Sequence, residues 1–457
     1  MKVHFIAIGG AAMHNLALAL MEKGYRISGS DDAIFNPSKS RLENAGICPD
    51  TMGWFPAKIT TDLDAVIIGM HARSDNPELL KAQQLNLPLF SYPEYLYEQS
   101  KDKIRIVIGG SHGKTTITSM ILHVLQNVGI DCDYMVGAQL KGFKTMVRLS
   151  DAPIIVLEGD EYLSSPLDLR PKFHLYKPHI ALLSGIAWDH INVFPTFENY
   201  IEQFKVFIDK IQPKGYLTYA SSDENLKNLV HNNDSVNFES YQLPDHKITE
   251  GITYIKSENS LIPLEIFGDH NLMNMMGALN ICKQLKVSDQ QFYNAMSSFM
   301  GASMRLEKVY QRKGLQVFKD FAHSPSKVKA TVMAVKTQFE DSKVIAVLEL
   351  HTFSSLNKSF LTEYKNTMNG VEVALVYFDP NAIVHKKLTI DASLYSRALS
   401  NEIIWVPDGS SSKAINLNRT RAFGHSSTLN YTFKIKTTPV MLLGQYEFVQ
   451  AETLRKD

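Results

Sequence analysis

Features that mark several other classes of protein are scarce in this sequence of 457 residues. It contains only three cysteines, Cys48, Cys132 and Cys282, whose spacing fits no zinc site and whose odd number leaves one thiol outside any set of disulfides. Basic and acidic residues balance at 47 each, so no excess charge attracts nucleic acid or an anionic membrane. These absences exclude a disulfide-stabilised scaffold and a basic nucleic-acid-binding protein, and they favour the reducing cytoplasm.

Long apolar runs are also missing, although 44% of the residues are hydrophobic. No stretch reaches the roughly 18 consecutive apolar residues that indicate a membrane-spanning helix. The first residues, Met-Lys-Val-His-Phe-Ile, lead directly into a strand-like run instead of the charged start and cleavable apolar stretch of an export signal. We therefore expect a globular protein that is neither exported nor embedded in a membrane.

Two common catalytic signatures are absent as well. No serine stands in a Gly-x-Ser-x-Gly turn, which argues against the nucleophilic serine of an α/β-hydrolase. The glycine turn at Gly9-Gly10 lacks the Gly-x-Gly-x-x-Gly spacing of a nicotinamide site, because Ala7 and Ala12 stand where glycine is expected. A nicotinamide-dependent enzyme is therefore disfavoured, and no enzyme nucleophile is predicted.

The most informative stretch that is present leads from residues 104–108, which are apolar except for Arg105, into a glycine-rich loop. A polyphosphate is bound by open backbone N–H groups, by a helix N-terminus, by a cation and by a hydroxyl that ligates Mg²⁺. Lys114 would supply the cation and Thr115 the hydroxyl. Because Ile108 stands where the general pattern has its first glycine, the loop is a shorter Gly-x-x-Gly-Lys-Thr-Thr variant, and the alternative is a plain glycine-rich turn. The predicted phosphate-binding residues are Gly110, Ser111, His112, Gly113, Lys114, Thr115 and Thr116.

Apolar runs also precede Glu158-Gly-Asp-Glu161 and Asp189-His190. Ligands of doubly wound sheets bind beyond the carboxyl ends of the strands, so we predict that Thr115, Glu158 and His190 converge on one metal–phosphate site. Two alternatives stay open. In the first, Glu158 is an exposed carboxylate at a strand end. In the second, His190 is a hydrogen-bond donor between domains, because it lacks the oxygen that Mg²⁺ prefers.

The alternation of strands and helices predicts an α/β protein, and the length predicts three domains. A Rossmann-like domain (1–100) carries Asp31 about 20 residues after its glycine turn, where a ribose hydroxyl could be held. A central domain (101–300) carries the phosphate loop on a parallel or mixed sheet, a second Rossmann-like domain (301–457) follows, and polar residues 98–103 are the first linker. The predicted strands are residues 3–8, 25–29, 64–70, 88–92, 104–108, 153–157, 179–186, 213–220, 315–318, 344–348, 373–378, 403–406 and 440–443.

Polar side chains at helix and strand ends supply further candidates. Asn271 and Asn274 lie three positions apart at the start of a predicted helix, where their amides could contact an adenine edge or cap the helix. Two strands of the last domain lead into Asp320-Phe-Ala-His323 and Glu349-Leu-His351, which form no catalytic triad by spacing or order. A lone histidine at a strand end is more often structural, but two such ends in one domain favour a cleft.

Taken together, these residues resemble the Mur ligase family, the ATP-dependent amide-forming enzymes of peptidoglycan synthesis. The resemblance covers most of the chain and weakens after about residue 360. Within the family, Ile8-Gly-Gly-Ala-Ala-Met13 and Gly29-Ser-Asp31 resemble the branch that uses UDP-N-acetylmuramate. The motifs that carry the resemblance, in the family's order, are Gly110-Ser-His-Gly-Lys-Thr-Thr116, Glu158-Gly-Asp-Glu161, Asp189-His190, Gly268-Asp-His-Asn-Leu-Met-Asn274, Arg305 and Asp320-Phe-Ala-His-Ser-Pro325.

The resemblance implies ATP and Mg²⁺ as cofactors and gives roles to residues along the chain. The implied catalytic residues are Lys114, His190, Arg305 and His323, and the implied metal ligands are Thr115, Glu158 and His190. Further nucleotide-binding residues are Asn271, Asn274, Arg305 and Asp320. The substrate-binding residues are Gly9, Gly10, Ala12, Met13, Asp31, His71 and His351. The implied partners are UDP-N-acetylmuramate and an amino acid or peptide amine, bound by a monomer or weak homo-oligomer, with no nucleic acid or membrane.

Two members of this branch differ in the amine that they use. One adds L-alanine, and the other attaches the recycled tripeptide L-alanyl-γ-D-glutamyl-meso-diaminopimelate. Residues 29–40, 168–173 and 188–194 look more like the tripeptide enzyme, and Thr352 and Ser355 stand where alanine-adding members have arginines. Because their loss removes two cations that would hold a carboxylate, we predict the tripeptide as the amine, with L-alanine as the alternative.

Three further expectations concern the reaction as a whole. Water would destroy an acyl phosphate, so we expect domain closure about hinges at residues 96–103 and 299–305. No lysine near residues 198–210 aligns securely with the carbamylated lysine of many family members, so that role stays unassigned. A distant alternative is a P-loop switch or transporter ATPase without ligase activity, whose ATP hydrolysis would not require a UDP-sugar.

Overall fold

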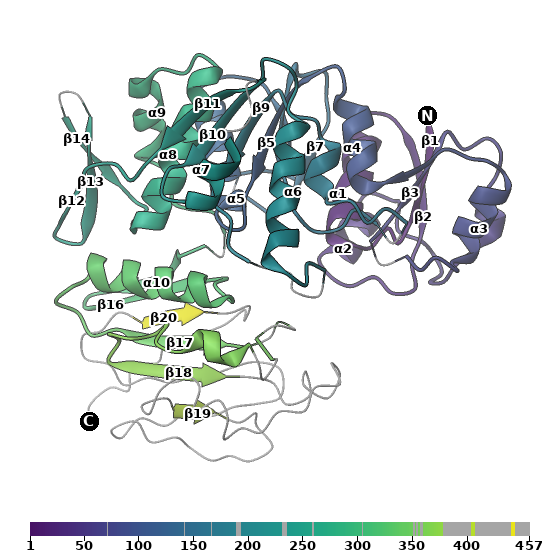
Figure 1. Ribbon diagram of the computed structural model, residues 1–457. Coiled ribbons are helices and arrows are strands. Elements are labelled where there is room, and N and C mark those ends of the chain that lie inside the picture. Colours follow the sequence, from purple (N-terminus) through teal and green to yellow (C-terminus); the bar gives the residue numbers. More distant parts are fainter. Residues whose placement is uncertain are drawn as a thin grey trace. The chain divides into compact units, whose positions relative to one another are not determined.

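The computed structural model describes residues 1–70, 72–140, 142–165, 167–188, 193–230, 235–257, 260–303, 305–350, 352, 355–356, 360–377, 404–406 and 440–443. These residues form two compact units (Figure 1). Unit 1 comprises Met1–Pro244 and Met273–Phe299, and unit 2 comprises Asp245–Leu272 and Met300–Asp457. Within the described ranges, no helix combines the length and the apolar character that a bilayer crossing requires.

The first sheet of unit 1 has four parallel strands in the order β2-β1-β3-β4. Its strands are β1 (Lys2–Ile6), β2 (Arg26–Ser30), β3 (Ala65–Ile68) and β4 (Leu89–Ser91), and its helices are α1 (Ala11–Glu22), α2 (Ser38–Asn44), α3 (Pro77–Gln84) and α4 (Tyr92–Ser100), with a 3-10 turn at Pro56–Lys58. The central strands β1 and β3 are buried along almost their whole length, as strands of a parallel sheet are when helices cover both faces. The four strands predicted for the first domain are confirmed.

The second sheet of unit 1 has seven strands in the order β11-β10-β9-β5-β8-β6-β7. Its strands are β5 (Ile104–Gly109), β6 (Asp133–Met135), β7 (Val147–Arg148), β8 (Ile154–Glu158), β9 (Ile180–Leu183), β10 (Tyr216–Ala220) and β11 (Asn237–Tyr241). Only β7 runs antiparallel to its neighbour, so this is the mixed sheet that the sequence predicts. Because β5 lies between β8 and β9, the three strands with chemically active ends are direct neighbours.

The helices that follow these strands are α5 (Lys114–Val128), α6 (Phe197–Asp209), α7 (Glu224–Val230), α8 (Asp269–Gln284) and α9 (Asp289–Met296), with a 3-10 turn at Lys172–Leu175. One continuous apolar core joins the two sheets of unit 1 and includes Phe5 of β1, Val107 of β5 and Leu157 of β8. Helix α1 also reaches the second sheet, because the buried Asn15 side chain accepts the N–H of Met146 at 2.9 Å. The two sheets therefore share one hydrophobic core.

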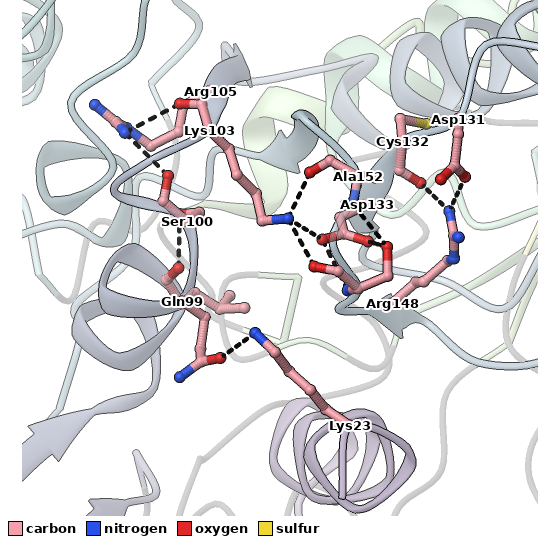
Figure 2. Close-up of polar contacts among 12 residues, drawn as sticks. Lys23, Gln99, Ser100, Lys103, Arg105, Asp131, Cys132, Asp133, Arg148 and Ala152 are labelled. Carbon is pink, nitrogen blue, oxygen red and sulfur yellow. Dashed lines mark hydrogen bonds and ion pairs between the residues drawn. The ribbon is translucent and has the colours of Figure 1, made fainter.

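Two positively charged side chains, Arg105 and Lys103, bond to the chain where the two sheets of unit 1 are connected (Figure 2). The buried Arg105 guanidinium donates to the backbone oxygens of Ser100, Lys101, Lys103, Tyr176 and Lys177. Lys103 Nζ lies 2.9 Å from the fully buried carboxylate of Asp133. The linker predicted at residues 98–103 is wrong in its first half, because residues up to Ser100 continue α4. This bonding also argues against the predicted hinge at residues 96–103.

Unit 2 contains an antiparallel sheet of three strands and a second sheet of six strands. The first is formed by β12 (His246–Thr249), β13 (Ile252–Ser257) and β14 (Ser260–Leu264). The second has the order β15-β16-β20-β17-β18-β19 and is parallel except for β15. It consists of β15 (Glu307–Arg312), β16 (Leu315–Asp320), β17 (Ile345–Glu349), β18 (Val373–Tyr377), β19 (Ile404–Val406) and β20 (Val440–Leu443), with helix α10 (Pro325–Gln338) and a 3-10 turn at Leu361–Tyr364.

The five strands predicted for the last domain are confirmed, and so is the α/β fold class with mostly parallel sheets. The strands β6, β7 and β11 to β15 were not predicted, because they are only two or three residues long or lie within residues 237–312, where polar residues interrupt the apolar runs. The domain boundaries at residues 100 and 300 stay predictions.

Candidate active site

The phosphate loop begins where β5 ends at Gly109 and continues until α5 starts at Lys114. Gly110 and Gly113 have φ values of +120° and +80°, which side chains rarely adopt. A Cβ atom at Gly110 would lie 2.1 Å from Ser184 Oγ, and one at Gly113 would lie 2.3 Å from Asn274 Oδ1. Both glycines are therefore required, and the glycine N-cap leaves the first N–H groups of α5 free of a side-chain cap, as an anion-binding helix terminus requires.

Lys114 projects from the first turn of α5 back over this loop. Its Nζ donates to the backbone oxygen of Gly110 at 2.8 Å and pairs with Glu161 at 2.5 Å. The Lys114 side chain is 13% exposed and that of Glu161 is 1% exposed, so water screens the pair weakly. Burial lowers the pKa of Lys114, but attraction to Glu161 and then Asp160 outweighs burial and leaves this pKa above its ordinary value. The ammonium therefore stays charged beside the loop.

The two predicted oxygen ligands lie together at the ends of β5 and β8. Thr115 donates its hydroxyl to Glu158 Oε1 at 2.8 Å, and Glu158 Oε2 accepts the N–H of Gly137 at 2.7 Å. Glu158 is buried, so the alternative of an exposed strand-end carboxylate is wrong. Burial raises the pKa of Glu158, against the hydrogen bond from Gly137 and the charge of Lys114, which lower it.

This pair suits a hard cation, because a hydroxyl and a carboxylate are the oxygen ligands that Mg²⁺ prefers. Among the described residues, no group of three His, Cys, Asp or Glu side chains is arranged to hold a metal ion. His190, the third predicted ligand, lies outside the described residues together with Asp189. The described side chains therefore supply two of the three predicted ligands.

The remaining loop residues are held by neighbouring segments. The Ser111 hydroxyl bonds to Tyr200 OH at 2.8 Å and accepts the N–H of Ala187 at 2.9 Å. The His112 ring bonds through Nδ1 to the backbone oxygen of Ser111 at 2.7 Å, and Thr116 is buried in the first turn of α5. These contacts fix the loop, and the Ser111 N–H adds a further bond, to the backbone oxygen of Gly185 at 3.0 Å.

The two asparagines of α8 have different surroundings. Asn274 lies against the phosphate loop, since its side-chain oxygen fills the space that a Cβ atom on Gly113 would need. Asn271 donates its side-chain amide to the backbone oxygen of Phe267, four residues earlier, at 3.0 Å. In this bond the Asn271 amide is the donor, so the bond does not cap the N–H groups of α8, and adenine binding by Asn271 stays a prediction.

The first glycine turn, between β1 and α1, contains most of the predicted substrate-binding residues. Asp31 Oδ2 accepts the N–H of Gly9 at 2.7 Å, and a Cβ atom at Gly9 would lie 2.9 Å from that same oxygen. Burial raises the pKa of Asp31 above its ordinary value, although the Gly9 N–H lowers it. Gly10 is the N-cap of α1, Ala12 is exposed in its first turn and Met13 is buried. The turn therefore presents a helix N-terminus beside a fixed carboxylate, and His71 lies outside the described residues.

Three predicted residues of unit 2 lie together around Phe321. The Arg305 guanidinium lies over the Phe321 ring at 4.9 Å, and the His323 ring meets its edge at a centroid distance of 4.9 Å. Asp320, at the end of β16, accepts the hydroxyl of Thr331 at 2.7 Å. Burial raises the pKa of Asp320, while Thr331 and the charge of Arg305 lower it.

The segment predicted to recognise the amine substrate is only partly described, since His351 lies outside the described residues. Thr352 and Ser355 bond each other, with their hydroxyl oxygens 2.9 Å apart, and each hydroxyl also accepts the other residue's backbone N–H. These two side chains are therefore hydrogen-bonded to each other, and neither carries a positive charge.

Two buried residues at the loop were not predicted as functional. Glu161 lies in the motif Glu158-Gly-Asp-Glu161, and its acidic side chain beyond a strand end was a usable signal. Tyr200, on α6, gave no such signal, because an aromatic residue on an amphipathic helix is expected to belong to the core.

Two family models match successive parts of the chain. A model described as the Mur ligase middle domain matches residues 108–282, and one described as the Mur ligase family, catalytic domain, matches residues 2–103. A UDP-N-acetylmuramate–L-alanine ligase of Clostridium kluyveri is 34% identical over 382 residues, which cover 80% of this chain and 81% of the relative.

Two solved structures show the same fold over nearly the whole chain. A UDP-N-acetylmuramate-alanine ligase from Thermotoga maritima superposes with a TM-score of 0.69 at 19% identity, covering 97% of this chain and 95% of that one. A murein peptide ligase from Psychrobacter arcticus superposes with a TM-score of 0.68 at 21% identity and the same coverage. At these identities the superpositions establish the fold.

Proposed function

The chain belongs to the Mur ligase family, whose members form amide bonds with ATP, and we propose that it joins the lactyl carboxylate of UDP-N-acetylmuramate to the amine of an amino acid or peptide. The observation that best supports the proposal is the pairing of Lys114 with Glu161 and of Thr115 with Glu158 at one glycine-rich helix start. Such an arrangement suits the phosphates of ATP. The product would serve peptidoglycan synthesis, in the cytoplasm that the scattered cysteines favour.

The chemistry needs ATP because a carboxylate oxygen is a poor leaving group. The lactyl carboxylate attacks the γ-phosphorus, an O–P bond forms, the bond to the bridging oxygen breaks, and ADP leaves. The amine nitrogen then attacks the carbonyl carbon of the acyl phosphate, and inorganic phosphate leaves with the electron pair of the C–O bond while the nitrogen loses its proton. In this scheme Lys114 and Arg305 offset the charge of the transferring phosphoryl group, and no enzyme nucleophile takes part.

We assign the cation site to Thr115 and Glu158, with His190 as the third predicted ligand. A bound Mg²⁺ would supply positive charge next to the phosphates. The buried Glu158 carboxylate is held beside Thr115 by the Gly137 N–H, so these two residues would offer their oxygens from one place.

The other ligands are assigned to the two glycine turns and to the residues around Phe321. The Gly9-Gly10 turn and Asp31 would bind the uridine diphosphate. Asn271 and Asn274 would contact the adenine, and Asp320 the rest of the nucleotide. His323 would lie on the substrate side. A monomer or weak homo-oligomer remains the proposed state.

L-Alanine is the amine that the relatives support, since the curated relative at 34% identity bears that name. This favours the alternative of the sequence analysis over its first choice, the tripeptide. One observation keeps the tripeptide as a second candidate: Thr352 and Ser355 hydrogen-bond to each other and carry no positive charge, where alanine-adding members have arginines.

The direct test is to incubate the protein with ATP, Mg²⁺ and UDP-N-acetylmuramate, adding L-alanine to one sample and the tripeptide to another, and to identify the product by mass. We expect one amide product, formed with stoichiometric ADP. Lys114→Ala is the control and should lose turnover with its folding intact. ATP hydrolysis that is independent of the UDP-sugar, with no amide in either sample, would instead support the P-loop switch.

A further inference from the structure

A buried series of hydrogen bonds runs from the backbone of Ala187 to Lys114 in the phosphate loop. The Ala187 N–H donates to Ser111 Oγ at 2.9 Å, Ser111 Oγ bonds to Tyr200 OH at 2.8 Å, and Tyr200 OH donates to Glu161 Oε1 at 3.1 Å. The other oxygen of Glu161 accepts from Lys114. These hydrogen bonds thus connect the segment after β9, the phosphate loop, α6 and the segment after β8.

The direction of each bond follows from the number of hydrogens. A tyrosine hydroxyl has one hydrogen, and Tyr200 gives it to the carboxylate of Glu161, so Ser111 must be the donor in the bond between the two hydroxyls. Ser111 in turn accepts from a backbone N–H that cannot rotate. All donors therefore point toward Glu161, which accepts from Tyr200 on one oxygen and from the Lys114 ammonium on the other.

Burial makes these bonds strong. Tyr200 is 0% exposed, Glu161 1% and Ser111 4%, so hydrogen bonds to the charged carboxylate are not weakened by water. The Tyr200 ring itself is locked between Phe194 and Phe204, at centroid distances of 5.4 and 5.2 Å. The hydroxyl is therefore held at a fixed point by the core of unit 1.

We propose that Tyr200 and Glu161 are positioning residues that set the place of the Lys114 ammonium before ATP arrives. Without them, of the bonds described above, Lys114 keeps that to the backbone oxygen of Gly110. The four-carbon side chain then samples more rotamers, and its charge meets the transferring phosphoryl group in only some of them. The inference rests on the proposed role of Lys114 as a phosphate ligand. It further means that Tyr200, on α6, affects how well Lys114 stabilises the transferring phosphoryl group.

The test compares Tyr200→Phe with Tyr176→Phe in the full chain. Both rings are fully buried in the same core, but the Tyr176 hydroxyl has no hydrogen-bond partner in the described part of the chain, so its removal is a matched control. We expect kcat for amide formation to fall about tenfold in Tyr200→Phe, with KM for the UDP-sugar unchanged, and to stay at the wild-type value in Tyr176→Phe.

A merely structural Tyr200 gives a different result. The melting temperature would then fall while kcat, measured well below that temperature, equals that of the wild type, and the proposal would be overturned. Glu161→Gln is the second variant, because it keeps the size of the side chain and removes the charge that holds the ammonium. It should also lose kcat, and wild-type kcat in this variant would likewise overturn the proposal.

Lys114→Ala separates this inference from the proposed function. If Lys114→Ala retains activity, the role of the lysine in ATP use is wrong. If Lys114→Ala is inactive while Tyr200→Phe and Glu161→Gln match the wild type, the lysine role stands and the positioning role fails.

Discussion

At the scale of single residues, the two ends of α5 allow the cost of backbone strain to be separated from the cost of a blocked site. Gly113 starts the helix and Gly129 ends it, and both have positive φ values, +80° and +75°. A Cβ atom at Gly129 meets nothing within 4 Å, whereas one at Gly113 runs into Asn274. Gly129→Ala should therefore lower the free energy of unfolding by about 1 kcal/mol and leave turnover intact.

Gly113→Ala should introduce the same backbone strain, and it should also displace the loop or Asn274. Because a misplacement of about 1 Å in a phosphoryl-transfer site can cost roughly a hundredfold in rate, we expect ATP-dependent amide formation to fall by about that factor. Steady-state kinetics and urea unfolding of both variants check this. Equal activities in the two variants would contradict the close packing of Asn274 on the loop.

A buried histidine gives a residue-scale prediction about pH. His174 bonds through Nε2 to the backbone oxygen of Gln203 at 2.7 Å, and burial is the main cause that lowers its pKa to about 4, against an ordinary value of 6.5. Below pH 6.5 the unfolded chain binds the proton and the folded chain does not, so stability falls as the pH drops from 6.5 toward 4. The two pKa values differ by an amount worth about 3 kcal/mol at most.

His174→Gln can keep the bond to Gln203 but cannot titrate. Its free energy of unfolding, measured in urea at several pH values, should therefore vary less between about pH 6.5 and about pH 4 than that of the wild type, and differ little from it at about pH 7.5. Parallel pH curves for the two proteins would show that His174 is not the group responsible.

At the scale of elements, the contacts of Arg105 predict how firmly α4 is fixed to β5 (Figure 2). Its guanidinium satisfies five backbone oxygens, among them those of Ser100 and Lys101 at the end of α4. Arg105→Met would remove the guanidinium donors from these oxygens, although Ser100 would keep the N–H of Lys103 at 3.0 Å, so we expect a loss of about 3 kcal/mol in the free energy of unfolding.

Lys23→Met is the matched control for this change. Lys23 is only partly buried and makes a single bond, to Gln99 Oε1 at 3.0 Å, in the same region of the described chain. Its replacement should change the free energy of unfolding by no more than about 0.5 kcal/mol. Similar small losses in both variants, measured by urea unfolding, would mean that the junction relaxes and could still act as a hinge.

The elements also explain which parts of the fold the sequence could predict. Buried parallel strands such as β3 and β9 are continuous apolar runs, and these were located. The edge strand β15 is exposed along most of its length and reads Glu-Lys-Val-Tyr-Gln-Arg, so its composition resembles a loop. The same reasoning applies to β12, whose residues alternate between partly buried and exposed positions.

The candidate site divides in a similar way. Lys114, Thr115 and Glu158 stand next to glycines or strand ends, where the local sequence carries a signal, and the structure brings them together. Tyr200 reaches the site from α6, a helix far along the chain from the loop, and only the tertiary packing of that helix gives it a partner. Contacts of that kind have no local sequence pattern.

At the scale of the whole molecule, the continuous core of unit 1 predicts that its two sheets unfold together. The core joins Phe5 of the first sheet to Leu157 of the second, and Arg41 adds a polar contact with Gln139 at 2.9 Å. Domains that share a core lose it in one step, whereas domains on a bare linker unfold separately. The predicted boundary at residue 100 would then separate two sheets but not two folding units.

Tryptophan fluorescence can test this, because the chain has only three tryptophans. Trp54 packs beside the first sheet, and Trp188 lies near α6, where its ring faces Phe197 at 6.4 Å. With Trp405 replaced by Phe in both, a variant that keeps only Trp54 and one that keeps only Trp188 should unfold in urea at the same midpoint. Adding Arg105→Met should lower both midpoints together. Two separate midpoints before that change would mean that the first sheet unfolds independently, and the shared core would then contribute too little free energy to couple the sheets.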